Sequence, residues 1–406
     1  MMSPVHPSRR RSGGPVRFAA VTAVLALGAA GCSIDLSSWR PGGGGDEPSP
    51  SPTPVEAAPL LESALEALGS SPAVAVQGQI AANAEGTVNE TSLTVTDSGA
   101  VYGSIQESEN DAEVMQADGK LFVNAPAEYW LDQSVVNPDT DQYDGTWVRV
   151  SKDQLGIDPG AVLAPAKLSE ILGGFAPESG TASLENLDGT SAYRIDLEGG
   201  EKNRAWIGEE SGELLRIEIE QLAAADSDSG PRTRLNFSAV ETADIETVYD
   251  DILAIAEEGL KGSRDARLPV NWDGKLDLNC QTGGKCTVTG KAKDESDGGE
   301  GTVLVRMDAT LNNEELGEKK CDDTASLKAG KTAELTCSVN YNLAPSSAPR
   351  EYEITGDALL STRGMSGKGK DELIAAVKDQ REATLEGGKD GGASESPSPE
   401  ESPSDD

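Results

Sequence analysis

Histidine and cysteine are among the side chains most often used for acid-base, nucleophilic and metal chemistry, and both are rare in this sequence. The single histidine, His6, lies in an N-terminal segment whose sequence indicates that it is cleaved. Serine and cysteine triads and histidine-containing zinc sites all need an imidazole. A mature chain without histidine forms none of them, so we expect a protein that is not an enzyme and that has no cofactor. Of the five cysteines, one lies near the start of the chain and four lie in its last third: Cys32, Cys280, Cys286, Cys321 and Cys337.

The negative net charge of the chain argues against one class of binding partner. The chain has 34 Lys and Arg against 70 Asp and Glu, for a net charge of −36. Binding to a phosphate backbone needs a basic stripe, so we expect no nucleic-acid partner. A pair of carboxylates, as glycosidases use, is the catalytic alternative that needs no histidine. A sugar cleft usually adds aromatic platforms, and aromatic residues make up only 4% of this chain.

The first 31 residues predict an export signal. Arginines at positions 9, 10, 11 and 17 precede an apolar run that is too short to span a bilayer, which takes about 20 residues. The run ends in Ala29-Ala30-Gly31-Cys32, which resembles the bacterial lipobox, although the family usually has an aliphatic residue where Ala29 stands. The resemblance implies that Cys32 is acylated, for example with palmitate, and anchors the protein to the membrane. The sequence leaves open whether export follows the Sec or the twin-arginine route.

Two segments have compositions that cannot form a core. Residues 32–56 contain a glycine run followed by a Ser-Pro-rich stretch, and residues 387–406 are rich in Gly, Ser, Pro and Glu. Both lack the apolar surface that folding requires. We expect a disordered tether after the anchor and a disordered acidic tail at the end.

Residues 57–260 show the patterns of a first folded domain. Residues 57–68 have the apolar spacing of an amphipathic helix, and the period then changes to the alternation of strands with one buried face. Short turns such as Asp118-Gly119 and Asp188-Gly189 join these strands as hairpins. Helical patterns interrupt them at 167–172 and 244–257. The simplest assembly is a curved antiparallel sheet with helices on its concave face.

Three stretches of this domain carry a family resemblance: Asp144–Val150, Arg204–Gly208 and Gly212–Glu218. Together with the lipobox, the tether and the first helix, they resemble the actinobacterial envelope lipoproteins of the LppX/LprG kind and, more distantly, the LolA/LolB lipoprotein carriers. The resemblance implies a half-barrel whose concave face holds acyl chains, in a protein anchored on the outer face of the membrane of a Gram-positive, actinobacterial cell envelope.

The concave face would then contain a ligand cavity. A lipid cavity and a filled core need the same aliphatic residues, so the alternation does not separate these alternatives. If a cavity exists, the residues that we expect to line it are Val95, Val123, Ile195, Ile207 and Ile217.

Residues 268–362 predict a second, all-β domain. Short alternating runs recur with turns about every ten residues, as in a β-sandwich. The stretches Gly301–Val305 and Ala325–Cys337 are similar to bacterial immunoglobulin-like and fibronectin-type modules. An amphipathic helix is expected after it, at 371–386.

The four cysteines of this second domain favour disulfides in an exported protein. Three connectivities are possible, and we choose Cys280–Cys286 and Cys321–Cys337 because each closes a short loop. A zinc site is the competing interpretation, but no CxxC spacing supports it. The acidic loop at 139–145 does not match a calcium-binding EF-hand. We therefore expect no metal.

Taken together, the sequence predicts a mainly β protein: an N-terminal curved antiparallel half-barrel with helices on its concave face, then an immunoglobulin-like β-sandwich. The leading functional hypothesis is a non-enzymatic, membrane-anchored lipoprotein whose first domain binds or carries a lipid or another amphiphile. The alternative is a structural or protein-interaction lipoprotein with no small-molecule ligand. The sequence identifies no protein partner.

Overall fold

The computed structural model describes residues 54–81, 88–107, 110–133, 135, 142–224, 227, 229–296, 301–343 and 348–390. The expected signal segment, Cys32, most of the tether and the last sixteen residues lie outside these ranges. Within the described residues, no helix combines the length and the apolar composition needed to cross a membrane.

The first domain is built on a twelve-stranded sheet, the half-barrel, whose strand order is β12-β6-β5-β4-β3-β2-β1-β11-β10-β9-β8-β7. All neighbouring strands are antiparallel except β12 and β6. The strands are β1 (Ala73–Ala81), β2 (Val88–Thr96), β3 (Val101–Glu107), β4 (Asn110–Ala117), β5 (Lys120–Ala125), β6 (Thr146–Val150), β7 (Ser183–Leu187), β8 (Thr190–Asp196), β9 (Arg204–Gly208), β10 (Leu214–Ile219), β11 (Arg232–Ala239) and β12 (Arg264–Asp265). The predicted hairpins are confirmed, with Asp118 and Asp188 in the left-handed conformation that such turns require.

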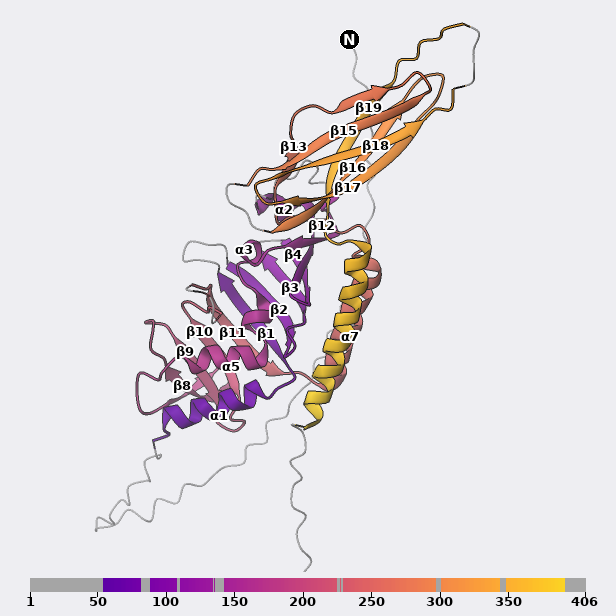
Figure 1. The fold of residues 1–406 in the computed structure, drawn as a ribbon. Coiled ribbons are helices and arrows are strands. Elements are labelled where there is room, and N and C mark those ends of the chain that lie inside the picture. The colour runs from indigo at the N-terminus through magenta and orange to yellow at the C-terminus, as the bar shows by residue number, and fades with distance from the viewer. Residues whose placement is uncertain are drawn as a thin grey trace, which may run out of the picture. The chain divides into compact units, whose positions relative to one another are not determined.

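One face of this sheet, the inner face, carries the main apolar core. Its alternate residues pack with α1 (Ala57–Gly69) and α5 (Pro165–Gly173). Three short helices, α2 (Ala127–Asp132), α3 (Lys152–Leu155) and α4 (Pro159–Val162), add side chains to the same core. The mainly β half-barrel with helices against one face is therefore confirmed (Figure 1).

One expected helix packs on the other side of the sheet. The pattern at 244–257 corresponds to α6 (Thr242–Ala254) and the π-helical turn η2 (Ile255–Gly259), which we expected on the concave face with the other helices. Its residues Ile245 and Ile252 instead form a core with Met115 and Phe122. These two strand residues alternate with inner-face residues, so α6 covers the outer face. The expectation was wrong because the stripe of a helix shows that one side is buried and not which surface buries it.

The last described helix, α7 (Gly367–Asp390), also packs on the outer face. It follows the second domain in sequence, and its Leu373 and Val377 are fully buried in the same core as α6. Arg381 pairs with Asp250 of α6 at 2.7 Å. Figure 1 shows α7 on the side of the sheet away from α1 and α5.

The second domain consists of two sheets that share one apolar core. In the first, β15 pairs with β13, β14 and β18, and in the other, β16 lies between β17 and β19. This is the β-sandwich that the sequence predicts. The strands are β13 (Val270–Trp272), β14 (Asp277–Cys280), β15 (Lys285–Asp294), β16 (Thr302–Asn312), β17 (Lys319–Lys328), β18 (Thr332–Asn340) and β19 (Thr355–Arg363).

All four cysteines of the sandwich are paired. Cys280 bonds Cys286 across the β14–β15 pair, and Cys321 bonds Cys337 between β17 and β18. These are the two bonds that we chose from the three connectivities. The second bond joins the two sheets, because β17 and β18 belong to different ones. With their sulfurs in disulfides, these cysteines do not form the competing zinc site.

Candidate functional site

The five residues expected to line a cavity come together on the inner face. They lie on β2, β5, β8, β9 and β10, and none is more than 2% exposed. All belong to the core that α1 and α5 cover, so the five residues share one face of the sheet, as the alternation predicts. Whether they contact a ligand stays a prediction. The residues are Val95, Val123, Ile195, Ile207 and Ile217.

Helices α1 and α5 form the cover of this apolar layer. Leu61 and Leu65 of α1 and Leu168 and Leu172 of α5 are buried in it. The two helices touch closely at Gly69, where an added Cβ would lie 3.1 Å from the hydroxyl of Ser169. That hydroxyl donates to the carbonyl of Leu65 at 2.7 Å. The cover thus meets the sheet mainly through aliphatic side chains, which is the kind of contact that an acyl chain can replace.

The inner face becomes polar at one end, a feature that the alternation pattern did not predict. Glu107, the last residue of β3, is only 6% exposed, and the side chain of Gln133 donates a hydrogen bond to its carboxylate. Tyr129 of α2 lies nearby. Burial, and then the charge of Glu107, raise the pKa of Tyr129 far above its usual value, so its phenol stays neutral. The signal in the sequence is that Glu107 continues the inner alternation of Val101, Gly103 and Ile105.

The cations of the half-barrel strands lie on the outer face. On β1–β11, every Lys and Arg alternates with inner-face residues, and several form cross-strand ion pairs, such as Arg194 with Glu185 at 3.1 Å. Glu107 is the one charged residue at an inner position of these eleven strands. The seven outward cations are Lys120, Arg149, Arg194, Arg204, Arg216, Arg232 and Arg234.

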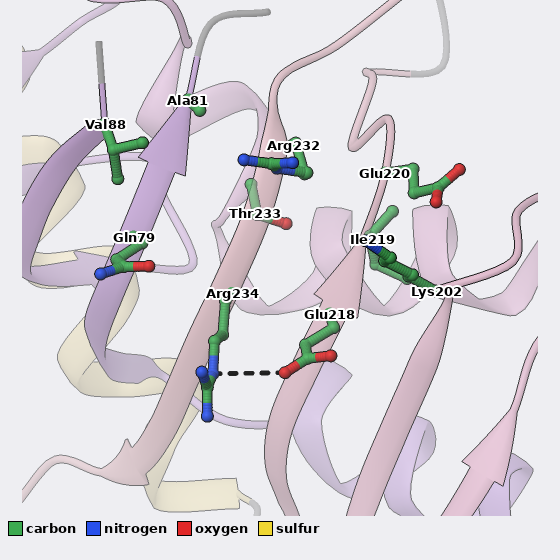
Figure 2. Close-up of a pocket in the computed structure, with 10 residues that line it drawn as sticks. All are labelled: Gln79, Ala81, Val88, Lys202, Glu218, Ile219, Glu220, Arg232, Thr233 and Arg234. Carbon is green, nitrogen blue, oxygen red and sulfur yellow. Dashed lines mark ion pairs between the residues drawn. The ribbon is translucent and has the colours of Figure 1, made fainter. Parts of the chain in front are cut away.

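A surface pocket of about 290 Å³ lies over the ends of β1, β2, β10 and β11. Figure 2 shows its side chains, among which Arg234 pairs with Glu218 at 3.2 Å. Arg232, Arg234 and Gln79 are outer-face residues, and charges of both signs line the pocket. A mixed, half-exposed charged surface does not suit an acyl chain. The lining residues are Gln79, Ala81, Val88, Lys202, Glu218, Ile219, Glu220, Arg232, Thr233 and Arg234.

A second surface pocket, of about 410 Å³, lies on the outer face of β1–β4. Gln77, Ser92 and Glu113 contribute to its lining, and all three alternate with inner-face residues. Neither of these two pockets is lined by any of the five residues that we expected at a cavity.

Asp265 is a deeply buried carboxylate outside the inner face. It is 1% exposed, and burial raises its pKa even though Arg267 pairs with it at 2.7 Å. Its backbone N–H donates a hydrogen bond to the hydroxyl oxygen of Thr362, and its carbonyl accepts one from the hydroxyl of Tyr143. These partners come from the half-barrel and from β19 of the sandwich. The carboxylate itself is hydrogen-bonded by Arg267, and among the described residues its charged partners are Arg267 and Arg149 rather than the second carboxylate that a glycosidase uses.

The strand order and the helical cover define the class of fold. A curved antiparallel sheet whose inner face is closed by helices is the LolA/LppX-like half-barrel that the resemblance implies, here followed by a β-sandwich and an outer-face helix.

Solved structures include several chains that are similar to this one. No protein-family model matches the chain, and no curated protein matches it. The crystal structure of LprF from Mycobacterium bovis is similar at 14% identity and a TM-score of 0.28, over 44% of this chain and 90% of that one. The crystal structure of MucB is similar at 12% identity and a TM-score of 0.23, over 68% of this chain and 93% of that one. At these TM-scores the comparisons carry no functional argument, and the fold rests on the strand order described above.

Proposed function

We propose that this chain is a membrane-anchored, extracytoplasmic and non-enzymatic lipoprotein whose half-barrel binds or carries an amphiphile. The acyl chains lie between the inner face of the sheet and helices α1 and α5. The observation that carries the proposal is the aliphatic inner layer, which gathers Val95, Val123 and Ile207 under a cover of two helices.

The anchor of the proposed protein is Cys32, acylated after removal of residues 1–31. This places the folded domains on the outer face of the cell membrane, in a Gram-positive, actinobacterial envelope. Two disulfides support the extracytoplasmic location, because such bonds persist in oxidising compartments. The sandwich serves as a spacer or as a platform for a protein partner.

The proposal is tested by finding the amphiphile. The full chain with Cys32→Ser is produced in an actinobacterial host, and native mass spectrometry and organic extraction detect what co-purifies. We expect a stoichiometric acylated species. Repeated absence of any acylated species, together with no binding of a neutral hydrophobic dye, would favour the alternative, a structural or protein-interaction lipoprotein without a small-molecule ligand.

Two buried alanines supply a matched pair of variants. Ala205 on β9 is an inner-face residue, whereas Ala192 on the adjacent β8 is an outer-face residue, and both are fully buried. Replacing either with Leu overpacks its surroundings to a similar degree. Only Ala205→Leu takes space from the layer that holds the acyl chains. We expect Ala205→Leu to reduce the co-purified lipid and Ala192→Leu to retain it.

A further inference from the structure

The polar end of the inner face contains more than Glu107. Asn89 of β2 lies directly opposite Glu107 on one side and Ile80 of β1 on the other, and Thr233 of β11 lies opposite Ile80 from the far side. Residues opposite each other in antiparallel strands point to the same face. Thr91, two residues after Asn89, points there as well. This end of the inner face therefore carries a polar row of Asn89, Thr91, Glu107 and Thr233, which Ile80 interrupts between Asn89 and Thr233.

Three members of this polar row have unused hydrogen-bonding atoms. Among the described residues, Thr91 Oγ1, Thr233 Oγ1 and Asn89 Oδ1 are buried and have no hydrogen-bond partner. Thr91 is 5% exposed and Thr233 is 3% exposed. A buried polar atom without a partner costs free energy comparable to a lost hydrogen bond, so native proteins rarely leave several on one surface. Their clustering beside the aliphatic layer indicates that a molecule from outside the chain supplies their missing hydrogen bonds.

The charges around the polar row restrict what that partner can be. Glu107 is the charged residue of this face, and all the Lys and Arg side chains on β1–β11 are on the outer face. Of the covering helices, α5 carries Lys167, which is 62% exposed and pairs with Glu170. Lys202, Arg232 and Arg234 line the surface pocket that Thr233 borders, but no Lys or Arg of β1–β11 occupies an inner position. A phosphate placed on the inner side of the row would lie near the buried carboxylate of Glu107, with the strand cations on the opposite face of the sheet. Hydroxyl groups, in contrast, can donate to Asn89 and Glu107 and exchange hydrogen bonds with both threonines.

We propose that the polar row binds the head group of the amphiphile, and that this head group is an uncharged polyol such as glycerol or a sugar. The inference rests on the proposed function and specifies the ligand of the same half-barrel. The acyl chains occupy the aliphatic layer under α1 and α5. The hydroxyls of the head group take the positions opposite Thr91, Thr233 and Asn89, with the neutral Tyr129 phenol and Gln133 close to Glu107.

Probes that share one acyl chain test the head group. The full chain with Cys32→Ser is loaded with the neutral dye N-phenyl-1-naphthylamine, which is displaced with 1-monooleoylglycerol or with oleoyl lysophosphatidylglycerol. We expect the uncharged monooleoylglycerol to displace the dye at a concentration at least about tenfold lower. Equal or stronger displacement by the phosphate lipid would overturn the inference.

Isosteric variants locate the head group at the polar row. Thr91→Val and Thr233→Val each remove one hydroxyl that has no partner in the protein, so folding is retained. We expect each variant to lower the affinity for monooleoylglycerol by about three- to tenfold, which is the effect of one hydrogen bond. Dye binding should stay unchanged. The matched control is Thr94→Val on the outer side of β2. This variant should change neither the affinity for monooleoylglycerol nor the binding of the dye. Unchanged lipid affinity in both inner variants would mean that only water occupies the row, and would overturn the inference.

A third variant tests the role of charge. Glu107→Gln removes the buried carboxylate, so we expect the preference for monooleoylglycerol over the phosphate lipid to shrink. A preference that is unchanged in this variant would contradict the electrostatic argument. If the protein with an unmodified row binds the dye and binds both lipids equally, the proposed function stands and the inference fails, whereas a protein that binds neither dye nor lipid overturns both.

Discussion

The hydroxyl of Tyr249, on α6, lies 2.8 Å from the hydroxyl of Thr384, on α7, although 135 residues separate them in sequence. The Tyr249 oxygen is also 2.7 Å from Ser98 Oγ and 3.2 Å from Thr96 Oγ1. This buried network connects the last helix to α6 and to the turn after β2. It fixes where α7 lies along the outer face, which apolar packing alone does not specify.

Tyr249→Phe should therefore destabilise the protein. The change leaves the buried hydroxyls of Thr96 and Thr384 with one partner fewer while keeping the ring in place. We expect the free energy of unfolding, measured by urea denaturation, to fall by about 1–3 kcal/mol. The control is Tyr102→Phe, whose hydroxyl makes only a long, exposed bond of 3.5 Å to Glu113 and whose loss should stay within about 0.5 kcal/mol. Equal effects would contradict the network.

The apolar contact of α7 can be tested in the same way. Leu373 is fully buried against the α6 core, whereas Leu359 of β19 is 42% exposed. Leu373→Ala creates a cavity and should cost about 2–5 kcal/mol. Leu359→Ala removes the same atoms from a half-exposed site and should cost much less. A small effect at Leu373 in urea denaturation would show that α7 detaches readily from the half-barrel.

Stability should depend on Tyr129 at high pH. Burial raises the pKa of Tyr129 above its usual value of 10.0, so above pH 10 the unfolded chain releases this proton while the folded chain retains it. The stabilising contribution of the neutral phenol is thus fully present below pH 10 and is lost as the pH rises beyond it. In thermal unfolding at several pH values, we expect Tyr129→Phe to lose less stability between pH 9 and pH 11 than the parent protein, and an equal loss in both proteins would contradict this role of Tyr129.

The two disulfides should differ in their contributions. Cys321–Cys337 has a sequence separation of 16 and joins the two sheets of the sandwich, whereas Cys280–Cys286 has a separation of 6 within one strand pair. Loop-closure entropy gives about 3 kcal/mol for the first and about 2 kcal/mol for the second. Paired Cys→Ala variants, compared by thermal unfolding, should show the larger loss at Cys321 and Cys337. The reverse order would indicate that the hairpin bond organises the domain.

Local patterns in the sequence predicted much of the fold. Alternation identified the inner-face residues, such as Ile195 and Ile217, because a strand with one buried face has a period of two. The same reasoning assigned α6 to the wrong face. A helical stripe such as Ile245 and Ile252 records burial only, and the partner surface is set by chain reversals that no short window contains.

The polar row was missed for a related reason. Thr91 and Thr233 resemble ordinary strand residues, because threonine is common in strands whether it faces solvent or the core. Their significance depends on the register, which puts Thr233 opposite Ile80 and Thr91 opposite Gly78 on the inner face, and on the lack of hydrogen-bond partners, which only the structure reveals. Glu107 could have been recognised, since it continues an inner alternation where a charge is unexpected.

The return of α7 to the half-barrel gives the chain the architecture of an insertion. The amide of Gly364, where the chain leaves the sandwich, donates to the carbonyl of Ser263, where the chain approaches it, at 2.9 Å. The sandwich is thus an insertion in the chain of the half-barrel, and the two ends of this insertion are hydrogen-bonded to each other. A single short bridge would therefore close the half-barrel chain without the sandwich and leave the aliphatic inner layer intact.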